Sequence, residues 1–540
     1  MLRTLLMAAS IALSVLTGWS QESSQNVSVI PEPVQLVQKP GTFRLHRETT
    51  IVSLDRELLS SARYLSDYVN NYLGCPLKVE QIENEPGSIV LVNKKNGEVP
   101  GGYQLIINPD GVEVQGNDAA GVFYGVQTVI QLLPTRAGVL PVLPALEITD
   151  YPRFAYRGMH LDVARHFFPT SFVKKYIDYL ALHKMNYFHW HLTDDQAWRI
   201  EMKCRPELTA KGSMREGEIE GLYPGTYKPL PYGGYYTHEE VKEVIAYANE
   251  RHITVIPEID IPGHCMAVLA TYPQFSTTPN EPKKAALTWG IFNKFNNVLA
   301  PTPEVFDFLC DVFSELCDLF PGQYIHVGGD ECAKRWWQES KATQRFMKAH
   351  ALADEKALQS YFIDYVQRVV NAKGKTLIGW DEILEGGVSK DCIIMNWRKP
   401  TYGAKAVQAG HRTVMTCSAW SYFNLKESNT QAEIGPRGPL PLEKVYTYQI
   451  VPDGLTAEQA SLVWGAQGCL WTEYVPTTWK AEFAVFPRLS ALAENVWSPV
   501  RKKNWENFVR KMETQFERYD LWGARYSEAY FRTHDVVRKR

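Results

Sequence analysis

The sequence predicts an α/β protein, a (β/α)8 TIM barrel preceded by a small α+β domain. Three observations lead to this fold. The chain of 540 residues is long enough for more than one domain. From residue 157 onward, short apolar runs alternate with amphipathic helical stretches. Polar and aromatic residues gather where those runs end, which is where such a barrel carries its reacting groups.

The first residues have the pattern of a secretory signal, which we place at 1–21. Arg3 precedes an apolar run from Leu5 to Thr17, and small and polar residues follow it up to Gln21. The run is too short to cross a bilayer, and no later segment approaches the roughly 20 apolar residues that a membrane span needs. We therefore expect an exported protein without a transmembrane segment, in a periplasm, on a cell surface or secreted.

Residues 22–150 are predicted to form the α+β domain. Alternating apolar residues predict strands at 88–92, 103–108 and 112–114. Pro109-Asp110-Gly111 joins the last two as a hairpin. Apolar residues at three- and four-residue spacing predict helices over 58–73 and 119–133. Prolines at 134, 141, 144 and 152 predict an extended connection that ends the domain.

Residues 151–500 are predicted to form the barrel. Eight apolar runs of strand length lie at 158–163, 185–192, 253–259, 324–327, 376–380, 393–397, 412–417 and 463–470. Helical patterns between them lie at 171–183, 237–251, 303–320 and 358–373. A doubly wound open sheet is the competing fold for this rhythm. A helical segment within 501–540, from 505 to 519, closes the chain.

All eight runs end in, or are followed by, reactive residue types, and the beginnings of the runs show no comparable cluster. In chain order they are Asp162 and Arg165, His191 and Asp194, Asp260 and His264, Asp330 and Glu331, Trp380 with Asp381 and Glu382, Trp397 with Arg398, Tyr422 with Asn424, and Trp471 with Glu473. Any one of them is explained by packing or a surface ion pair. Their joint position predicts a site at the carboxyl ends of the strands.

The residue types narrow the chemistry. The sequence lacks a serine elbow, a phosphate-binding glycine loop and a dinucleotide fingerprint, so we expect no cofactor. The net charge of −3 gives no indication of nucleic acid. Carboxylates beside tryptophans favour glycoside hydrolysis, because indole rings stack on sugars and desolvation raises the pKa of a carboxyl group. Adjacent side chains diverge, so Asp330 and Glu331 are not the facing carboxylate pair of ordinary glycosidases.

Several long motifs in the same order closely resemble the glycoside hydrolase family 20 β-N-acetylhexosaminidases. They are Leu161-Asp162-Val163-Ala164-Arg165, His189-Trp190-His191-Leu192-Thr193-Asp194, Pro257-Glu258-Ile259-Asp260, His326-Val327-Gly328-Gly329-Asp330-Glu331 and Leu470-Trp471-Thr472-Glu473. The resemblance implies exo removal of terminal non-reducing β-linked GlcNAc or GalNAc from an oligosaccharide or glycoconjugate. It also implies retention of configuration through an oxazolinium ion formed by the substrate's own acetamido group.

The same resemblance implies roles for eleven residues. Glu331 would be the general acid and base, and Asp330 would hold the acetamido N–H. Asp194 and His264 would relay protons to Glu331. The remaining seven would contact the sugar: Tyr422 at the acetamido oxygen, Trp380, Trp397 and Trp471 around the acetyl group, and Arg165, Asn424 and Glu473 at hydroxyls.

Two other functions fit parts of the sequence. His189 and His191 at a strand end, with His264 and Asp330, are compatible with a metal-dependent barrel enzyme of the amidohydrolase type. No lysine follows on a later strand end to complete such a site, so we expect no metal. A non-catalytic sugar-binding protein is the second alternative, and it is expected to have lost Asp330 or Glu331, both of which are present.

Overall fold

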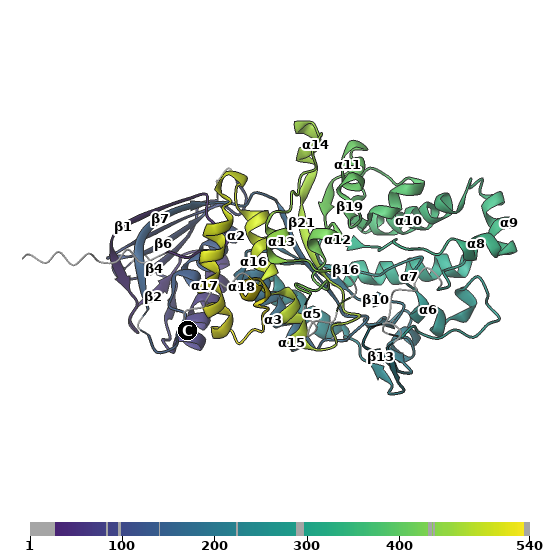
Figure 1. Cartoon of the computed structure of the whole chain (residues 1–540), viewed down its shortest axis with the longest axis horizontal. Helices are drawn as coiled ribbons and strands as arrows, with labels where there is room; N and C mark the ends of the chain where they lie inside the picture. Colours follow the sequence, from purple (N-terminus) through teal and green to yellow (C-terminus); the bar gives the residue numbers. More distant parts are fainter. Residues whose placement is uncertain are drawn as a thin grey trace, which may run out of the picture.

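The computed structural model describes residues 27–82, 85–95, 99–139, 141–222, 225–287, 296–429, 435 and 438–533. A seven-stranded sheet with two helices forms the N-terminal part, and a closed barrel surrounded by helices forms the rest (Figure 1). The expected signal segment lies outside the described residues. Among the helices described, none has the length and apolar character needed to cross a membrane.

The N-terminal sheet has the strand order β1-β7-β5-β6-β4-β2-β3. Its strands are β1 (Gln35–Arg44), β2 (Thr50–Val52), β3 (Lys78–Glu80), β4 (Ile89–Asn93), β5 (Tyr103–Asn108), β6 (Gly111–Gly116) and β7 (Val142–Asp150). The helices α1 (Leu59–Leu73) and α2 (Ala119–Leu132) pack on it. The predicted hairpin is confirmed, because β5 pairs antiparallel with β6 and Asn108 lies opposite Gly111.

The proline-rich stretch before residue 150 was wrongly interpreted as a connection, because most of it is the strand β7. Strand β7 pairs with β1 on one side and with β5 on the other. Pro144 lies opposite Thr42, where the register of β1 shifts between Gln38 and Thr42. A bulge of this kind interrupts the hydrogen-bond ladder, so a proline without an N–H group is tolerated inside the sheet.

Eight parallel strands close into the barrel, in the order β16-β17-β18-β19-β20-β21-β8-β9. They are β8 (Tyr156–Asp162), β9 (Tyr187–His191), β16 (Thr254–Glu258), β17 (Tyr324–His326), β18 (Thr376–Trp380), β19 (Ile393–Asn396), β20 (Thr413–Met415) and β21 (Val463–Leu470). Seven of the predicted apolar runs contain one of these strands in full, whereas β8 begins two residues before the run predicted at 158–163. The ring closes through pairing of β21 with β8, so the open-sheet alternative is wrong.

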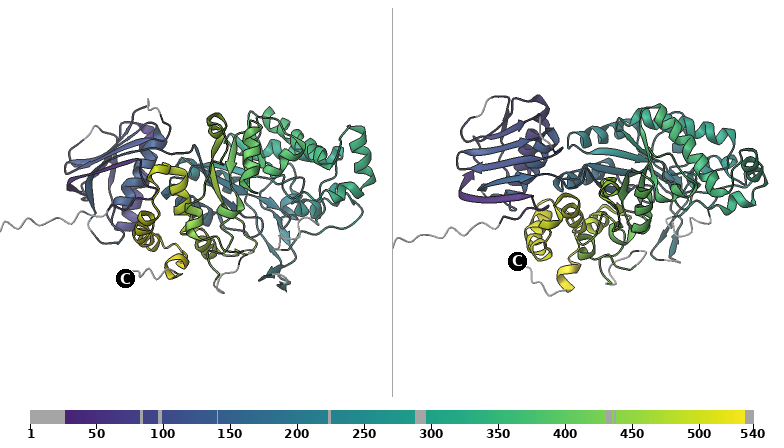
Figure 2. Two further views of the ribbon diagram at one scale, coloured as in Figure 1. Left: turned by 45° about the horizontal axis from the view of Figure 1, so that its top comes forward. Right: turned by 90° about the horizontal axis from the view of Figure 1, so that it is seen from above.

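Helices follow or separate the strands around the outside of the barrel (Figure 2). The longer ones are α3 (Thr170–Leu182), α5 (His238–Asn249), α7 (Pro303–Leu319), α9 (Lys341–Ala349), α10 (Glu355–Ala372), α11 (Pro400–Gln408), α15 (Thr478–Val485) and α16 (Arg488–Trp497). Shorter ones are α4 (Glu207–Ala210), α6 (Met266–Thr271), α8 (Arg335–Glu339), α12 (Ser418–Ser421), α13 (Leu442–Tyr446) and α14 (Ala457–Ser461). The C-terminal helices are α17 (Trp505–Leu521) and α18 (Ala529–Thr533).

The barrel interior is polar as well as aromatic. Where the strands begin, Tyr156 stacks on Tyr187 with ring centroids 4.4 Å apart. Further along, the Tyr156 hydroxyl donates to Gln467 Oε1 at 2.5 Å, and Gln467 Nε2 lies 3.0 Å from His189 Nδ1. Glu258 follows at the centre, fully buried. His189 Nε2 lies 3.0 Å from Glu258 Oε2, so these polar contacts lead along the interior toward the carboxyl ends of the strands.

The N-terminal domain joins the barrel through a buried charge pair. Asp150, the last residue of β7, accepts hydrogen bonds from Tyr103 at 2.8 Å and from Lys184 at 3.0 Å. Trp497 of α16 donates its indole N–H to the same carboxylate at 3.0 Å. Burial lowers the pKa of Lys184, and Asp150 opposes that change. This contact joins β5 and β7 of the N-terminal domain to α16 and to the turn after α3.

Candidate active site

The turn after β17 holds the two adjacent carboxylates in place. Gly328 and Gly329 have φ angles of 65° and 91°, in the left-handed region. A Cβ atom on Gly328 would lie 1.8 Å from Asp260 Oδ1, and one on Gly329 would lie 2.4 Å from Ile383 Cγ2. Both positions therefore require glycine. Glu331 also has a positive φ, of 43°, and non-glycine residues in this region are held by their surroundings at functional sites.

His264 brings the four predicted catalytic residues together. His264 Nδ1 lies 3.0 Å from Asp194 Oδ1. Its other ring nitrogen, Nε2, lies 3.6 Å from Asp330 Oδ2 and 3.7 Å from Glu331 Oε2. Although burial alone would lower the pKa of His264, Asp194 and Asp330 outweigh it and hold this pKa well above its usual range. The structure thus places the imidazole of His264 between Asp194 and the two carboxylates, and the raised pKa favours its charged form.

Glu331 differs from the expectation that indoles desolvate it. Its side chain is 46% exposed, and its backbone N–H donates to Glu382 Oε2 at 3.1 Å. Burial raises the pKa of Glu331, but the hydrogen bond from His264 and the nearby charges lower it overall. Glu382, which accepts the hydrogen bond from the Glu331 backbone, shows the opposite change, because burial and Asp330 raise its pKa to about 7. Glu331 is therefore ionised in the free protein, and His264 is its nearest source of a proton.

Asp330 projects into a different environment from its neighbour. Only 13% of its side chain is exposed, and its Oδ1 atom is buried without a hydrogen-bond partner among the described residues. Burial raises the pKa of Asp330, whereas His264 lowers it. Burial and Asp330 together hold the pKa of Asp260 well above its usual range. A carboxylate oxygen without a partner is suited to accept an N–H group from a ligand.

Arg165 lies between the loops after β8 and β9. Its guanidinium forms ion pairs with Asp194 at 2.8 Å and with Asp162 at 3.3 Å, and it donates to Gln196 at 2.9 Å. It also lies over the ring of Trp471, 5.1 Å from the centroid. Most of its donors are thus occupied by the protein. In this structure Arg165 orders Asp194, and the N–H groups that remain are available to a sugar hydroxyl.

Four aromatic side chains form one wall of the site. Trp471 lies 5.9 Å from Trp380 and 6.0 Å from Tyr422, measured between ring centroids. Tyr422 in turn stacks beside Trp397 at 6.3 Å with an interplanar angle of 19°. Trp380 is fully buried, and its indole N–H donates to Glu258 at 2.8 Å. The structure thus brings all four predicted aromatic residues together.

Asn424 and Glu473 complete the predicted set. An isolated bridge pairs Tyr422 with Cys469 of β21, and this bridge fixes the start of the segment that carries Asn424. The Oδ1 atom of Asn424, the Oε2 atom of Glu473 and the Nε1 atom of Trp397 are buried without hydrogen-bond partners in the described part of the chain. Buried polar groups normally have partners. These atoms therefore indicate a polar ligand with both donors and acceptors.

Glu258 and His191 connect to the relay through Asp194, on the side that faces the barrel interior. Glu258 was missing from the predicted site. Glu258 Oε2 lies 2.5 Å from His191 Nδ1, and His191 Nε2 lies 2.8 Å from Asp194 Oδ2. Glu258 outweighs burial and raises the pKa of His191 to about 10. His326 Nδ1 also lies 3.1 Å from Glu258 Oε1. The available signal was a carboxylate at the end of an otherwise apolar buried strand.

The residues of the metal hypothesis do not come together as one set. His189 and His191 both contact Glu258, so they lie on one face of the strand. In the described residues, however, His189 groups with Glu258 and His326, whereas His264 groups with Asp260 and Asp330. The geometry therefore favours the hydrogen-bonded relay over the proposed four-ligand metal site.

Two family models match the chain. The catalytic domain of glycosyl hydrolase family 20 matches residues 154–500, and domain 2 of the same family matches residues 26–151. Together the two matches cover the N-terminal domain and the barrel.

Curated relatives and solved structures agree with these matches. A β-hexosaminidase of Porphyromonas gingivalis is 40% identical over 517 residues, which are 94% of this chain and 65% of that protein. The chain thus spans just under two thirds of that relative. A β-hexosaminidase of Vibrio furnissii is 34% identical over 86% of this chain and 76% of its own length. A GH20 exo β-N-acetylglucosaminidase from Vibrio harveyi, solved with N-acetylglucosamine, aligns with a TM-score of 0.83 and 30% identity, covering 93% of this chain and 78% of that one.

Proposed function

The chain belongs to glycosyl hydrolase family 20, and from this membership we propose that it is an exo-acting β-N-acetylhexosaminidase. It would remove terminal non-reducing β-linked GlcNAc or GalNAc from glycans and retain the anomeric configuration. The contact of His264 with both Asp330 and Glu331 carries this proposal, at 3.6 Å and 3.7 Å. The His264 imidazolium would interact with both Asp330 and Glu331, two adjacent carboxylates with different roles in the reaction.

In the first step, Glu331 protonates the glycosidic oxygen as the bond to the anomeric carbon breaks. The carbonyl oxygen of the substrate's acetamido group attacks that carbon and closes an oxazolinium ring. Asp330 accepts the acetamido N–H, which orients the carbonyl oxygen and offsets the positive charge that develops. The Tyr422 hydroxyl donates to the acetamido oxygen, and the tryptophan wall encloses the methyl group.

In the second step, Glu331 is ionised and takes a proton from water, which attacks the anomeric carbon and opens the ring. The acetamido group is restored, and the sugar leaves with its original configuration. The positive charge on His264, which Asp194 stabilises, offsets the negative charge of Glu331 whenever Glu331 is ionised during this cycle. Because Glu331 is already ionised in the free protein, covering of the site by the sugar must raise its pKa before the first step.

The test compares p-nitrophenyl β-N-acetylglucosaminide with the plain p-nitrophenyl β-glucoside, which lacks the acetamido nucleophile. We expect the wild type to release p-nitrophenol only from the acetamido substrate. Glu331→Gln should lower kcat by about 10²- to 10⁴-fold, the usual contribution of a general acid and base. Asp330→Asn keeps the shape of the side chain and should also lower kcat strongly.

Equal hydrolysis of both glycosides would show that the acetamido group is not the nucleophile. The roles proposed for Asp330 and Tyr422 would then be wrong. Thermal unfolding of each variant provides the control, since the exposed Glu331 side chain contributes little to stability. Addition of a chelator to the wild type tests the metal alternative, which requires that activity be lost.

We also propose that the protein is exported. The charged, apolar and small-residue zones of residues 1–21 support this proposal. Expression in a bacterium with and without residues 1–21, followed by fractionation and mass measurement of the N-terminus, tests it. Retention of uncleaved full-length chain in the cytoplasm would contradict it.

A further inference from the structure

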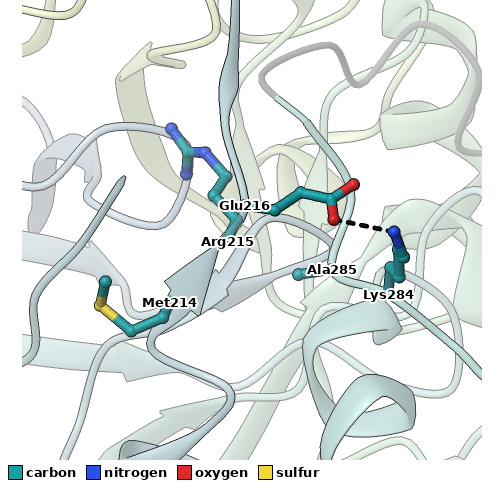
Figure 3. A pocket seen from close by; sticks show the side chains of 5 residues that line it. All are labelled: Met214, Arg215, Glu216, Lys284 and Ala285. Atoms are coloured by element: carbon teal, nitrogen blue, oxygen red, sulfur yellow. Dashed lines mark hydrogen bonds and ion pairs between the residues drawn. The ribbon is translucent and has the colours of Figure 1, made fainter. Parts of the chain in front are cut away.

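Two glutamates in loops at the carboxyl ends of the barrel strands have different electrostatic surroundings. Glu216 forms an ion pair with Lys284 at 2.8 Å at the edge of a pocket of about 330 Å³, where both side chains are largely exposed (Figure 3). Glu382, which follows β18, is half-buried, and its charged neighbours include Asp330 and Glu331. Like charges disfavour each other's ionised forms. The site thus holds a third carboxyl group beside two predicted catalytic ones.

Glu382 lies in η4 (Asp381–Gly386), a 3₁₀ helix that begins directly after β18. The residues on either side of it are fixed. Asp381 is fully buried and accepts a hydrogen bond from Arg398 Nε at 2.6 Å. Ile383 is also buried, with 1% of its surface exposed. The backbone of Glu382 is therefore held in place by both of its neighbours.

The helix η4 packs against the turn that follows β17. A Cβ atom on Gly329 would lie 2.4 Å from Ile383 Cγ2, so the Ile383 side chain fills the space beside this glycine. Gln359 of α10 donates to the carbonyl oxygen of Gly329 at 2.6 Å. Further along the turn, the Glu331 N–H donates to Glu382 Oε2 at 3.1 Å. Among these contacts, the one from Glu382 reaches the proposed general acid and base itself.

The backbone of Glu331 has a conformation that a residue with a side chain does not favour. Its φ of 43° lies in the left-handed region, where a Cβ atom is crowded by the backbone. Such a conformation persists only where surrounding contacts hold it. The backbone angles also set the direction of the Cα–Cβ bond, and hence where the carboxyl group can reach. A general acid must lie within hydrogen-bond distance of the atom that it protonates.

The hydrogen bond to the Glu331 N–H does not require a charge on Glu382. Because burial and Asp330 raise the pKa of Glu382 to about 7, its carboxyl group is divided between the ionised and the protonated form near neutral pH. A carboxyl oxygen accepts an N–H group in either form. The protonated form adds no negative charge beside Asp330 and Glu331. A neutral acceptor therefore suits this position, and the amide oxygen of a glutamine is an acceptor of the same reach.

We propose that Glu382 is a positioning residue for Glu331. By accepting the Glu331 N–H, its Oε2 atom holds the backbone angle that directs the Glu331 carboxyl group toward the glycosidic oxygen. The inference rests on the proposed function, since it requires that Glu331 be the general acid and base. Glu382 itself would touch neither the substrate nor the reacting atoms. Withdrawal of its oxygen should therefore weaken acid assistance to the leaving group.

Aryl β-N-acetylglucosaminides with different leaving groups measure that assistance. Phenolate is a strong base and departs slowly without a proton, whereas 2,4-dinitrophenolate departs with little help from an acid. The ratio of kcat/KM for the phenyl substrate to kcat/KM for the 2,4-dinitrophenyl substrate therefore falls when the general acid is misplaced. Glu382→Asp keeps the carboxyl group but shortens the side chain by one carbon. It should lower this ratio about tenfold, since misplacement of a catalytic group by about 1 Å can cost about 10²-fold.

Two further variants are matched controls. Glu382→Gln keeps the length and the acceptor but cannot ionise, so its ratio should stay close to that of the wild type. Glu385→Asp makes the same shortening in the same helix, where Glu385 is paired with Arg398 at 2.8 Å and with Lys356 at 3.2 Å. Its ratio should equal that of the wild type. Thermal unfolding of each variant establishes that folded proteins are compared.

An unchanged ratio in Glu382→Asp overturns the positioning role even where both kcat/KM values fall together, because a general loss of structure has that effect. A fall in Glu382→Gln as large as that in Glu382→Asp also overturns it, since the charge rather than the acceptor would then be responsible. A wild type that releases neither phenol nor 2,4-dinitrophenol would instead refute the proposed function.

Discussion

The core of the N-terminal domain and the centre of the barrel are built from different side chains. In the N-terminal domain, α1 and α2 pack on the sheet through aliphatic residues such as Leu65, Leu105 and Val126, all fully buried. The barrel centre holds four fully buried histidines with Glu258 and Gln467. The histidines are His160, His189, His191 and His326. Residues 27–150 contain one histidine, His46, of the 13 in the whole chain.

This difference separates two ways of holding a fold together. Aliphatic burial contributes about 25 cal/mol per Å² whatever the pH. The polar network of the barrel stabilises the fold only while each buried charge has its partner, since an unpaired one is costly. The barrel nevertheless contains this network, because the network ends at Asp194 and His264, which position Glu331. The N-terminal core positions none of the predicted catalytic residues.

Removing the central charge of the barrel should have the largest effect. Glu258→Gln leaves the His191 imidazolium without its closest counter-charge, and breaking a buried pair costs about 3–5 kcal/mol of unfolding free energy. We also expect the pH profile of kcat to change, because His191 would then interact with Asp194 alone. Urea unfolding and a pH series of kcat check both effects. Loss of stability with an unchanged pH profile would show that Glu258 does not act on the relay.

A matched change in the N-terminal core should affect stability alone. Leu105 is fully buried in β5, opposite Val114 and Ile148. Leu105→Ala should lower the free energy of unfolding by about 2–5 kcal/mol through lost burial and the cavity that remains. The kcat of the folded fraction should equal that of the wild type at every pH. A change in the pH profile here would contradict the proposed division between the two cores.

The stability of the barrel should fall in alkaline solution because of His191. Its pKa is raised to about 10 in the folded state, so the folded protein holds a proton that the unfolded chain loses near its ordinary value. This contribution is fully present below about pH 6.5 and is lost as the pH rises through about 10. The slope from this one group is at most about 1.4 kcal/mol per pH unit.

Denaturant titrations at pH 7, 8 and 9 measure that slope. His191→Gln should be less stable than the wild type at pH 7 and should lose less stability on the way to pH 9. Parallel curves for the two proteins would show that His191 does not hold the extra proton.

The smallest expected effect concerns a helix cap in the N-terminal domain. Asp118 accepts the N–H of Gly121 at 2.7 Å at the start of α2, and it accepts that of Gly101 at 2.8 Å. Asp118→Ala should cost about 1 kcal/mol. Asp118→Asn retains the acceptor and should cost less. The kinetic constants of both variants should equal those of the wild type, and a changed KM would connect this domain to the active site.

The barrel was predictable because each of its strands is a short apolar run bounded by loops, even β17, which has only three residues. Strand β1 was not predicted, and β7 was interpreted as a connection. Lys39-Pro40-Gly41 interrupts β1, and Pro144 interrupts the pattern of β7. The two breaks lie opposite each other at one bulge, which only the pairing of the strands reveals.

The site was predictable where residues follow strand ends, because the barrel itself brings those ends together. The contact of Glu258 with His191 depends on register instead. Glu258 pairs with His191 of β9 and with His326 of β17 at the same level of the barrel. The low pKa of Glu331 was also not predictable, since it arises from a histidine 67 positions earlier in the sequence.

The carboxylate at the end of β7 has a consequence for how this protein can be divided. A barrel expressed from residue 151 would retain Lys184 in its interior and lose the only anion that Lys184 is paired with among the described residues. It would also expose the part of Arg157 that donates to Tyr124. The two domains are therefore not independent folding units. A calorimetric scan should show a single cooperative transition. Gene fusions should carry residues 27–533 as one block, because α17 packs on the N-terminal domain, where Arg518 donates to the carbonyl oxygen of Gln131 at 2.7 Å.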